Sequence, residues 1–167
     1  MTQEPEDPTG GLTHVGADGS AHMVDVGDKS TTRRTAVAGS TFHTTTEVTD
    51  LLTAGRLPKG DVLATARVAA IMAAKQTSSL IPLCHQLALS AVDVRFEVRP
   101  GAVEVTATVS TTDRTGVEME ALTSVAVAGL TLHDMVKALD PHAHNDGIRL
   151  LEKTGGRRGH WTRTEGR

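Results

Sequence analysis

The sequence predicts an α+β fold in which helices pack on one face of an antiparallel sheet. Two runs of alternating apolar and polar residues, 92–98 and 103–109, predict neighbouring strands. An Ala-rich stretch at 61–77 and a long stretch of helical periodicity at 116–139 predict helices before and after them. Helices that alternate with antiparallel strands in one small domain are typical of this class.

The elements up to the hairpin follow from local signals. Residues 35–42 predict an early strand, and residues 61–77 a helix that begins after Asp61. The Asp61 carboxylate can cap the free backbone N–H groups of the first helical turn. Pro100-Gly101 is a turn pair between the two alternating runs, so these runs should form an antiparallel hairpin.

A long helix is predicted over residues 116–139, about 36 Å in length. Thr115 and Glu118 have the spacing of a capping box at its start. Asp140-Pro141 ends it, and residues 148–153 predict a short last strand. Apolar residues at steps of three and four form the face expected to contact the sheet: Leu122, Val125, Gly129, Leu132, Val136 and Leu139.

The opposite face of this helix should be polar and solvated, yet Val127 and Leu130 lie in its middle. Glu120 and Thr123 precede them on this face, and Asp134 and Lys137 follow. Apolar patches rimmed by polar groups usually mark partner surfaces, so we expect this face to contact another subunit. Glu120 and Asp134 are about 21 Å apart along the axis, so within one chain they cannot act on the same atom.

Asp134 and Lys137 are three residues apart and share a helix face. An acid and an amine in contact can exchange protons with a substrate. The alternative is an ordinary ion pair on the helix surface, and the spacing alone favours that interpretation.

Cys84 and His85 follow Pro82 in a loop after the first helix. Adjacent residues on an extended segment point in opposite directions, and the chain has no second Cys, so a shared metal is not expected. His85 could be an acid–base group, a hydrogen-bonding ligand or a core histidine.

Lys59 precedes a helix start, where backbone N–H groups favour anions. Lys75 either extends to water or points at an anion.

Composition narrows the function classes. The 167 residues fit one domain, and a single Cys rules out a disulfide framework. A net charge of -3 and 2% aromatic residues argue against nucleic-acid binding. The sequence has no apolar run of about 20 residues and no signal-peptide pattern, so we expect a cytoplasmic protein without a membrane span. We expect a disordered acidic leader at 1–11, one domain at 12–156 and a flexible basic tail at 157–167.

Eight short runs between residues 12 and 156 occur together in a fixed order, which is more specific than any single motif. They are 12–15, 22–26, 59–67 (KGDVLATAR), 72–75, 80–85 (LIPLCH), 115–123 (TGVEMEALT), 134–138 (DMVKA) and 148–156 (IRLLEKTGG). On these runs the chain resembles the MoaC family of molybdenum cofactor biosynthesis.

The resemblance implies a ferredoxin-like subunit in a homohexamer, a trimer of dimers with active sites at subunit interfaces. It implies a lyase that converts 3′,8-cyclo-7,8-dihydroguanosine 5′-triphosphate into cyclic pyranopterin monophosphate and pyrophosphate. The radical enzyme that makes this substrate would be a functional partner. No cofactor, metal, nucleic acid or membrane is implied.

By this resemblance, Asp134 is the catalytic acid–base residue and Lys137 and Lys59 are its catalytic partners. The substrate-binding residues would be Leu83, Cys84, His85, Met119, Glu120, Lys75 and Glu118. A triphosphate requires a local gathering of cations, which Lys59, Lys75 and Lys137 can supply, with Arg34 or the tail arginines as further candidates.

Two other interpretations remain open. One is a catalytically silent oligomeric protein on the same fold that holds a nucleotide or pterin. The other is a zinc or iron site at Cys84 and His85. Cys84 is not expected to be a nucleophile.

Overall fold

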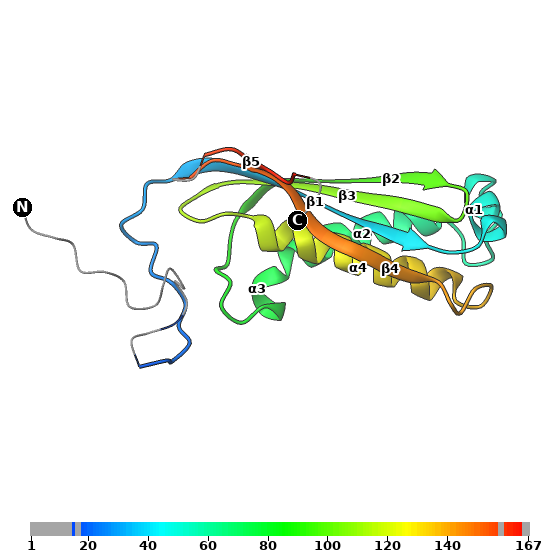
Figure 1. Ribbon diagram of the computed structural model, residues 1–167, viewed down its shortest axis with the longest axis horizontal. Helices are drawn as coiled ribbons and strands as arrows, with labels where there is room; N and C mark the ends of the chain where they lie inside the picture. Colours follow the sequence, from blue (N-terminus) through cyan, green and yellow to red (C-terminus); the bar gives the residue numbers. More distant parts are fainter. Residues whose placement is uncertain (1–14, 16–17, 157–158, 165–167) are drawn as a thin grey trace, which may run out of the picture.

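The structure is a computed structural model that describes residue 15, residues 18–156 and residues 159–164 (Figure 1). The expected leader at 1–11 lies outside these residues. The described chain forms one antiparallel sheet with helices on one face, which confirms the predicted fold class. No helix in this part of the chain is both long enough and apolar enough to cross a membrane.

The sheet has five strands in the spatial order β2-β3-β1-β4-β5, and every neighbouring pair is antiparallel. Their bounds are β1 Thr32–His43, β2 Leu89–Arg99, β3 Ala102–Asp113, β4 His144–Thr154 and β5 Trp161–Thr162. Helices connect β1 to β2 and β3 to β4, so the chain order through β4 is the ferredoxin-like β-α-β-β-α-β.

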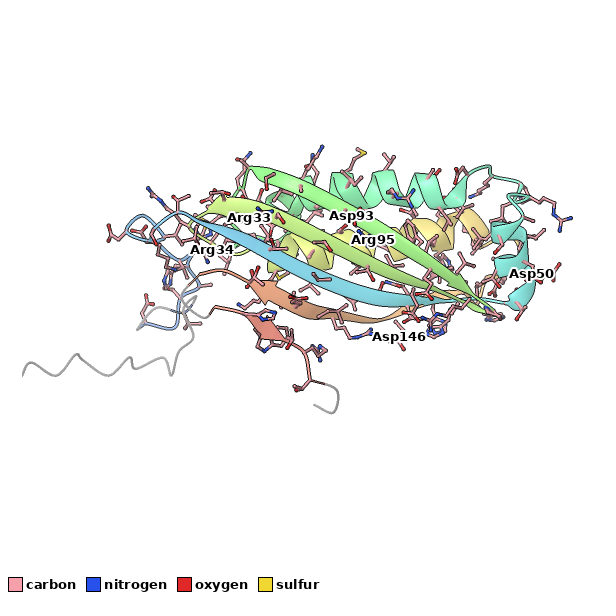
Figure 2. All side chains as sticks on the ribbon, turned by 90° about the horizontal axis from the view of Figure 1, so that it is seen from above. Arg33, Arg34, Asp50, Asp93, Arg95 and Asp146 are labelled. Carbon is pink, nitrogen blue, oxygen red and sulfur yellow. The ribbon has the colours of Figure 1, made fainter. Side chains whose placement is uncertain are left out.

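The helices are α1 (Thr46–Thr53), α2 (Val62–Lys75), α3 (Thr77–Leu80) and α4 (Glu118–Val136). Figure 1 shows α2 and α4 on the same side of the sheet, and Figure 2 looks onto the opposite side. As predicted, the carboxylate of Asp61 caps α2 by accepting the N–H of Ala64 at 2.9 Å.

The core lies between the sheet and these helices. Alternate residues of the central strands point toward α4, as the period of two requires. The other face of the sheet carries polar and charged side chains, with Asp93 and Arg95 among them (Figure 2). The buried core side chains from β1, β3 and α4 include Ala38, Phe42, Val103, Val105, Val109, Ala121, Val125, Leu132 and Val136.

Gly129 allows α4 to approach β4 closely. A Cβ atom at this position would lie 2.2 Å from the side-chain carbon of Asn145. The amide group of Asn145 is itself buried. The glycine is therefore required by packing rather than by backbone conformation.

The long helix differs from its prediction at both ends. It spans 19 residues, about 28 Å, and its N-cap residue Val117 makes no side-chain cap bond. The predicted capping box of Thr115 and Glu118 is therefore wrong. Glu118 instead forms an ion pair with Lys153 Nζ at 2.7 Å, because an ammonium is a stronger partner for a carboxylate than a neutral N–H. Leu139 lies beyond the helix end and is exposed, so it does not contact the sheet.

Other elements also differ in extent. β4 begins at His144, four residues before the predicted strand, and two register shifts in its pairing with β1 interrupt the alternation there. The short helices α1 and α3 were not predicted. β5 falls inside the expected tail, where Trp161 pairs with Lys153 and Thr162 with Glu152.

Replacement of Gly129 by valine should destabilise the fold, because the side chain would overlap Asn145. We expect a loss of about 1–3 kcal/mol in the free energy of unfolding, measured by thermal or denaturant unfolding. Ala126→Val, a similar change at a half-buried position of the same helix, is the control and should cost clearly less. Equal destabilisation by the two variants would contradict this account.

Candidate active site

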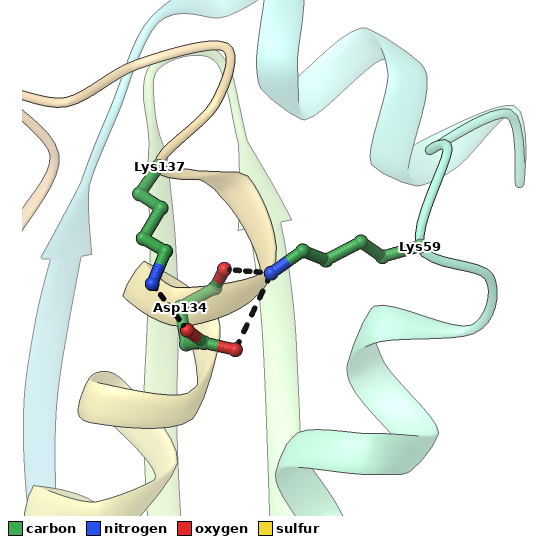
Figure 3. A network of polar contacts seen from close by, with 3 residues as sticks. All are labelled: Lys59, Asp134 and Lys137. Carbon is green, nitrogen blue, oxygen red and sulfur yellow. Dashed lines mark hydrogen bonds and ion pairs between the residues drawn. The ribbon is translucent and has the colours of Figure 1, made fainter.

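Asp134, Lys137 and Lys59 form a polar cluster at the C-terminal end of α4 (Figure 3). Lys137 Nζ lies 2.7 Å from Asp134 Oδ1. Lys59 Nζ lies 3.4 Å from Asp134 Oδ2 and 2.6 Å from the Asp134 backbone oxygen. Lys59 comes from the loop before α2, where Gly60 turns the chain with φ of +86°. The fold thus brings together the three residues predicted as catalytic.

The two lysines fix the ionisation of the carboxylate between them. The hydrogen bond from Lys137, followed by that from Lys59, holds the pKa of Asp134 below its usual value. The group is therefore a carboxylate near neutral pH, able to accept a proton. All three side chains are exposed in the single chain.

A second site is a cavity of about 280 Å³ at the start of α4, here called the Cys–His cavity. Its lining comes from the loop after α3, from the start of α4 and from the segment that contains Val24, Val26 and Lys29. Six of the seven residues predicted to bind substrate line it: Leu83, Cys84, His85, Glu118, Met119 and Glu120. The seventh, Lys75, is exposed at the last residue of α2 and lines none of the cavities described here.

His85 and Cys84 have distinct chemical states in this cavity. His85 Nε2 lies 2.8 Å from the backbone oxygen of Val24, which can only accept, so the proton is on Nε2 and Nδ1 is an acceptor in the neutral ring. Burial, and then the charge of Glu120, raises the pKa of the Cys84 thiol. A protonated thiol is a poor nucleophile. Within the described ranges, no group of three or more His, Cys, Asp or Glu side chains could hold a metal ion.

Glu120 is only 4% exposed, and Thr123 is also buried. Glu120 lines the Cys–His cavity together with Leu83, Cys84 and His85 of the loop after α3. Burial, and to a lesser degree the charge of Glu118, raises the pKa of Glu120. Glu118 is held by Lys153, and both side chains are about three-quarters buried.

A charged cavity of about 700 Å³ adjoins the Cys–His cavity, since Lys29 and Thr115 line both. Arg34 and Arg114 bring two more cations to its wall, and Asp25 and Asp28 bring two carboxylates. The Arg34 guanidinium is fixed by donating to the backbone oxygens of Asp113 at 3.3 Å and Arg114 at 3.1 Å. Sequence reasoning missed Lys29 and Arg114, because both lie in irregular segments without a recognisable pattern.

The candidate site is thus divided in the single chain. The exposed Asp134 cluster is at one end of α4, and the two cavities are at the other. The 14 residues between Glu120 and Asp134 correspond to about 21 Å of helix, as the sequence predicted.

The chain matches the MoaC family over residues 23–156. It is 63% identical over 155 residues to cyclic pyranopterin monophosphate synthase 2 of Mycobacterium tuberculosis, covering 93% of each chain. It is 56% identical over 151 residues to the cyclic pyranopterin monophosphate synthase of Corynebacterium efficiens, covering 90% of this chain and 97% of that one. The corresponding Streptomyces coelicolor protein is 54% identical over 159 residues, covering 95% and 94%. In agreement with the eight ordered sequence runs, this chain belongs to the MoaC family.

Proposed function

We propose that this protein is a cytoplasmic lyase that converts 3′,8-cyclo-7,8-dihydroguanosine 5′-triphosphate into cyclic pyranopterin monophosphate and pyrophosphate. The observation that supports it most directly is a pair of carboxyl groups in opposite environments. Asp134 is kept ionised by two lysines, whereas Glu120 is buried at the wall of the Cys–His cavity. Such pairs of carboxyl groups suit separate proton-accepting and proton-donating steps. Relatives of 54–63% identity that bear the synthase name support the same reaction.

Asp134 acts as the base in this proposal. Opening and re-closing the rings of the precursor requires proton transfers, and an ionised carboxylate can accept a proton from the substrate. Lys137 and Lys59 return protons or neutralise the charge that develops beside Asp134. The same ammonium groups favour departure of pyrophosphate, when a substrate hydroxyl displaces it from the α-phosphorus to close the cyclic phosphate.

The cavities hold the rest of the substrate. His85, Glu120 and the half-exposed Met119 contact the rings, while Leu83 and Cys84 limit the space. The triphosphate carries several negative charges although the whole chain has a net charge of -3, so cations must gather locally. Lys29, Arg34 and Arg114 of the charged cavity supply three cations, which outnumber the carboxylates of Asp25 and Asp28 on the same wall. Lys75 is proposed to contact the substrate bound at the site of a neighbouring copy.

We infer that the active site is completed by a second copy in a homohexamer, a trimer of dimers. The exposed face of the helix layer is apolar: Leu130 is 67% exposed, Met72 59% and Val68 57%. Val127 lies seven residues from both Glu120 and Asp134. Antiparallel packing of α4 on its copy around a two-fold axis at Val127 would place each Asp134 beside the Glu120 of the other chain.

In the cell, the substrate would come from the radical enzyme of the same pathway. A catalytically silent binding protein is the competing function. Tight binding of the cyclic triphosphate by the wild-type protein without any pyrophosphate release would favour that alternative.

Asp134→Asn should abolish most of the activity, because an amide cannot accept the proton. We expect pyrophosphate release to fall about 10²–10⁴-fold, with substrate affinity changed far less. Asp146→Asn, at an exposed carboxylate of β4, is the matched control and should retain wild-type turnover. Unchanged turnover in Asp134→Asn would remove this residue from the mechanism.

Glu120→Gln should stabilise the fold in a pH-dependent way. Because the folded-state pKa of Glu120 is raised, wild-type stability falls as pH rises above the ordinary carboxyl pKa of about 4.3, while glutamine is insensitive. The Tm of the variant should therefore match wild type near pH 4 and exceed it increasingly as pH rises above about 4.3, until the difference levels off above the folded-state pKa of Glu120. Glu47→Gln, at an exposed site on α1, should show no growing difference. A constant difference across this range would contradict the assigned environment.

Mixing Asp134→Asn protein with Glu120→Gln protein should restore activity if each site takes these residues from different chains. One site of each mixed dimer then has both native residues, and random exchange predicts about a quarter of wild-type pyrophosphate release. Each variant alone, taken through the same unfolding and reassembly, is the control. No recovery in the mixture would place both residues of a site in one chain.

A further inference from the structure

Arg34, near the start of β1, has a charge that no carboxylate of the described chain pairs with (Figure 2). Its side chain lies on the face of the sheet that carries α4, since Ala36, two residues on, is buried there. It accepts no bond and donates to the backbone oxygens of Asp113 and Arg114, which are neutral. The positive charge is therefore fixed in place without being neutralised.

The end of the Arg34 guanidinium fork is left free by these bonds. Nε donates to Asp113 and one N–H of Nη2 donates to Arg114, so one long side of the fork is used. A guanidinium has about five N–H groups in a fixed plane, so Nη1 and the second N–H of Nη2 remain. Parallel N–H groups of this kind match two oxygens of a phosphate group. Arg34 also lines the charged cavity, where such an anion can reach it.

Gly156 lies directly against the free nitrogen Nη1. It follows β4 and lines the same charged cavity as Arg34. A Cβ atom at Gly156 would overlap Arg34 Nη1 and lie 3.0 Å from its Cζ. A Cβ atom at Gly155, by contrast, would overlap the backbone oxygen of Arg33. A side chain at Gly155 would therefore disturb the strand, whereas one at Gly156 would displace only the end of a flexible side chain.

We propose that Gly156 is a positioning residue for Arg34. The absence of a side chain at Gly156 leaves the space that the guanidinium occupies, and the bonds to β3 hold it there with Nη1 and Nη2 available to an oligophosphate anion. The proposed function identifies this anion with the phosphate chain of the substrate. The inference rests on that function for this identification alone.

The carboxylates of the charged cavity make the placement of Arg34 important. Asp25 and Asp28 lie on the same wall and offset most of its positive charge. An anion is therefore bound through direct contact with individual cations rather than through the charge of the whole wall. The other two cations are Lys29 and Arg114. Of the three, only Arg34 has a side chain that is fixed by hydrogen bonds within the described ranges, and a donor held in position loses less conformational entropy on binding.

The test compares two glycines of one segment. Gly156 and Gly159 have φ values of +74° and +62°, but nothing in the described ranges lies within 4 Å of a Cβ atom at Gly159. Alanine brings similar backbone strain to both positions, so only Gly156→Ala also displaces the guanidinium. The Kd for inorganic pyrophosphate, measured by titration calorimetry on the full chain, should rise about 10–100-fold in Gly156→Ala, because a charge-assisted contact is lost. Gly159→Ala should stay within about twofold of wild type.

Removal of the guanidinium separates its position from other effects of Gly156. Without it, a Cβ atom at Gly156 has no nitrogen to displace. Arg34→Ala and Arg34→Ala/Gly156→Ala should therefore bind pyrophosphate equally weakly. If Gly156→Ala does not fold, Gly156→Asn and Gly159→Asn replace the alanine pair, because asparagine tolerates a positive φ and has the same Cβ atom.

The proposal is overturned by wild-type protein that does not bind pyrophosphate, by wild-type affinity in the Gly156 variant, or by an equal loss in the Gly159 variant. A further loss when Gly156→Ala is added to Arg34→Ala also overturns it. With the cyclic triphosphate as substrate, Gly156→Ala should raise KM more than it lowers kcat. Pyrophosphate binding requires no turnover. The expected Kd pattern without pyrophosphate release by wild type would therefore contradict only the proposed reaction, and normal release without that pattern would contradict only this inference.

Discussion

The rigidity of α4 constrains the whole candidate site. A helix cannot shorten, so the 14 residues between Glu120 and Asp134 keep these carboxyl groups about 21 Å apart in every state of the folded chain. The absence of a side chain at Gly129 lets this helix pack closely on Asn145 of β4. A small molecule that uses both groups must therefore be held between chains. Under the proposed function, this constraint makes assembly part of the chemistry.

Burial sets the chemical difference between the two ends of the helix. At the C-terminal end, water and two ammonium groups keep Asp134 charged. At the N-terminal end, burial keeps water from most of Glu120, and the charge of Glu118, which is paired with Lys153, lies nearby. Asp134 and Glu120 are both carboxylic acids, but the fold gives them different surroundings. The pKa of Asp134 is lowered as a result, and that of Glu120 is raised.

Local sequence signals predicted the regular elements well and the contacts between them poorly. The α+β class, the hairpin of β2 and β3 and the Asp61 cap depend on neighbours in sequence, and the structure confirms them. The capping box failed because the competing partner of Glu118 is 35 residues away in β4. No local pattern could reveal such a partner.

The candidate site was likewise predicted only in part from the sequence. Family resemblance selected residues that the fold does bring together, including Lys59 with Asp134 and the six residues around the Cys–His cavity. Burial of Glu120 was missed, because it depends on tertiary contacts that no local pattern reveals. Lys29 and Arg114 were missed, because cations on irregular segments reveal nothing until the chain is folded.

The chain has one tryptophan, and β5 places it opposite Lys153, the residue that holds Glu118 at the cavity wall. Directly paired residues share a face of the sheet, so the indole lies within reach of that ammonium. Trp161 is partly exposed, and its emission therefore responds to local water and charge. The protein therefore contains its own optical probe, placed across the β4–β5 pair from Lys153.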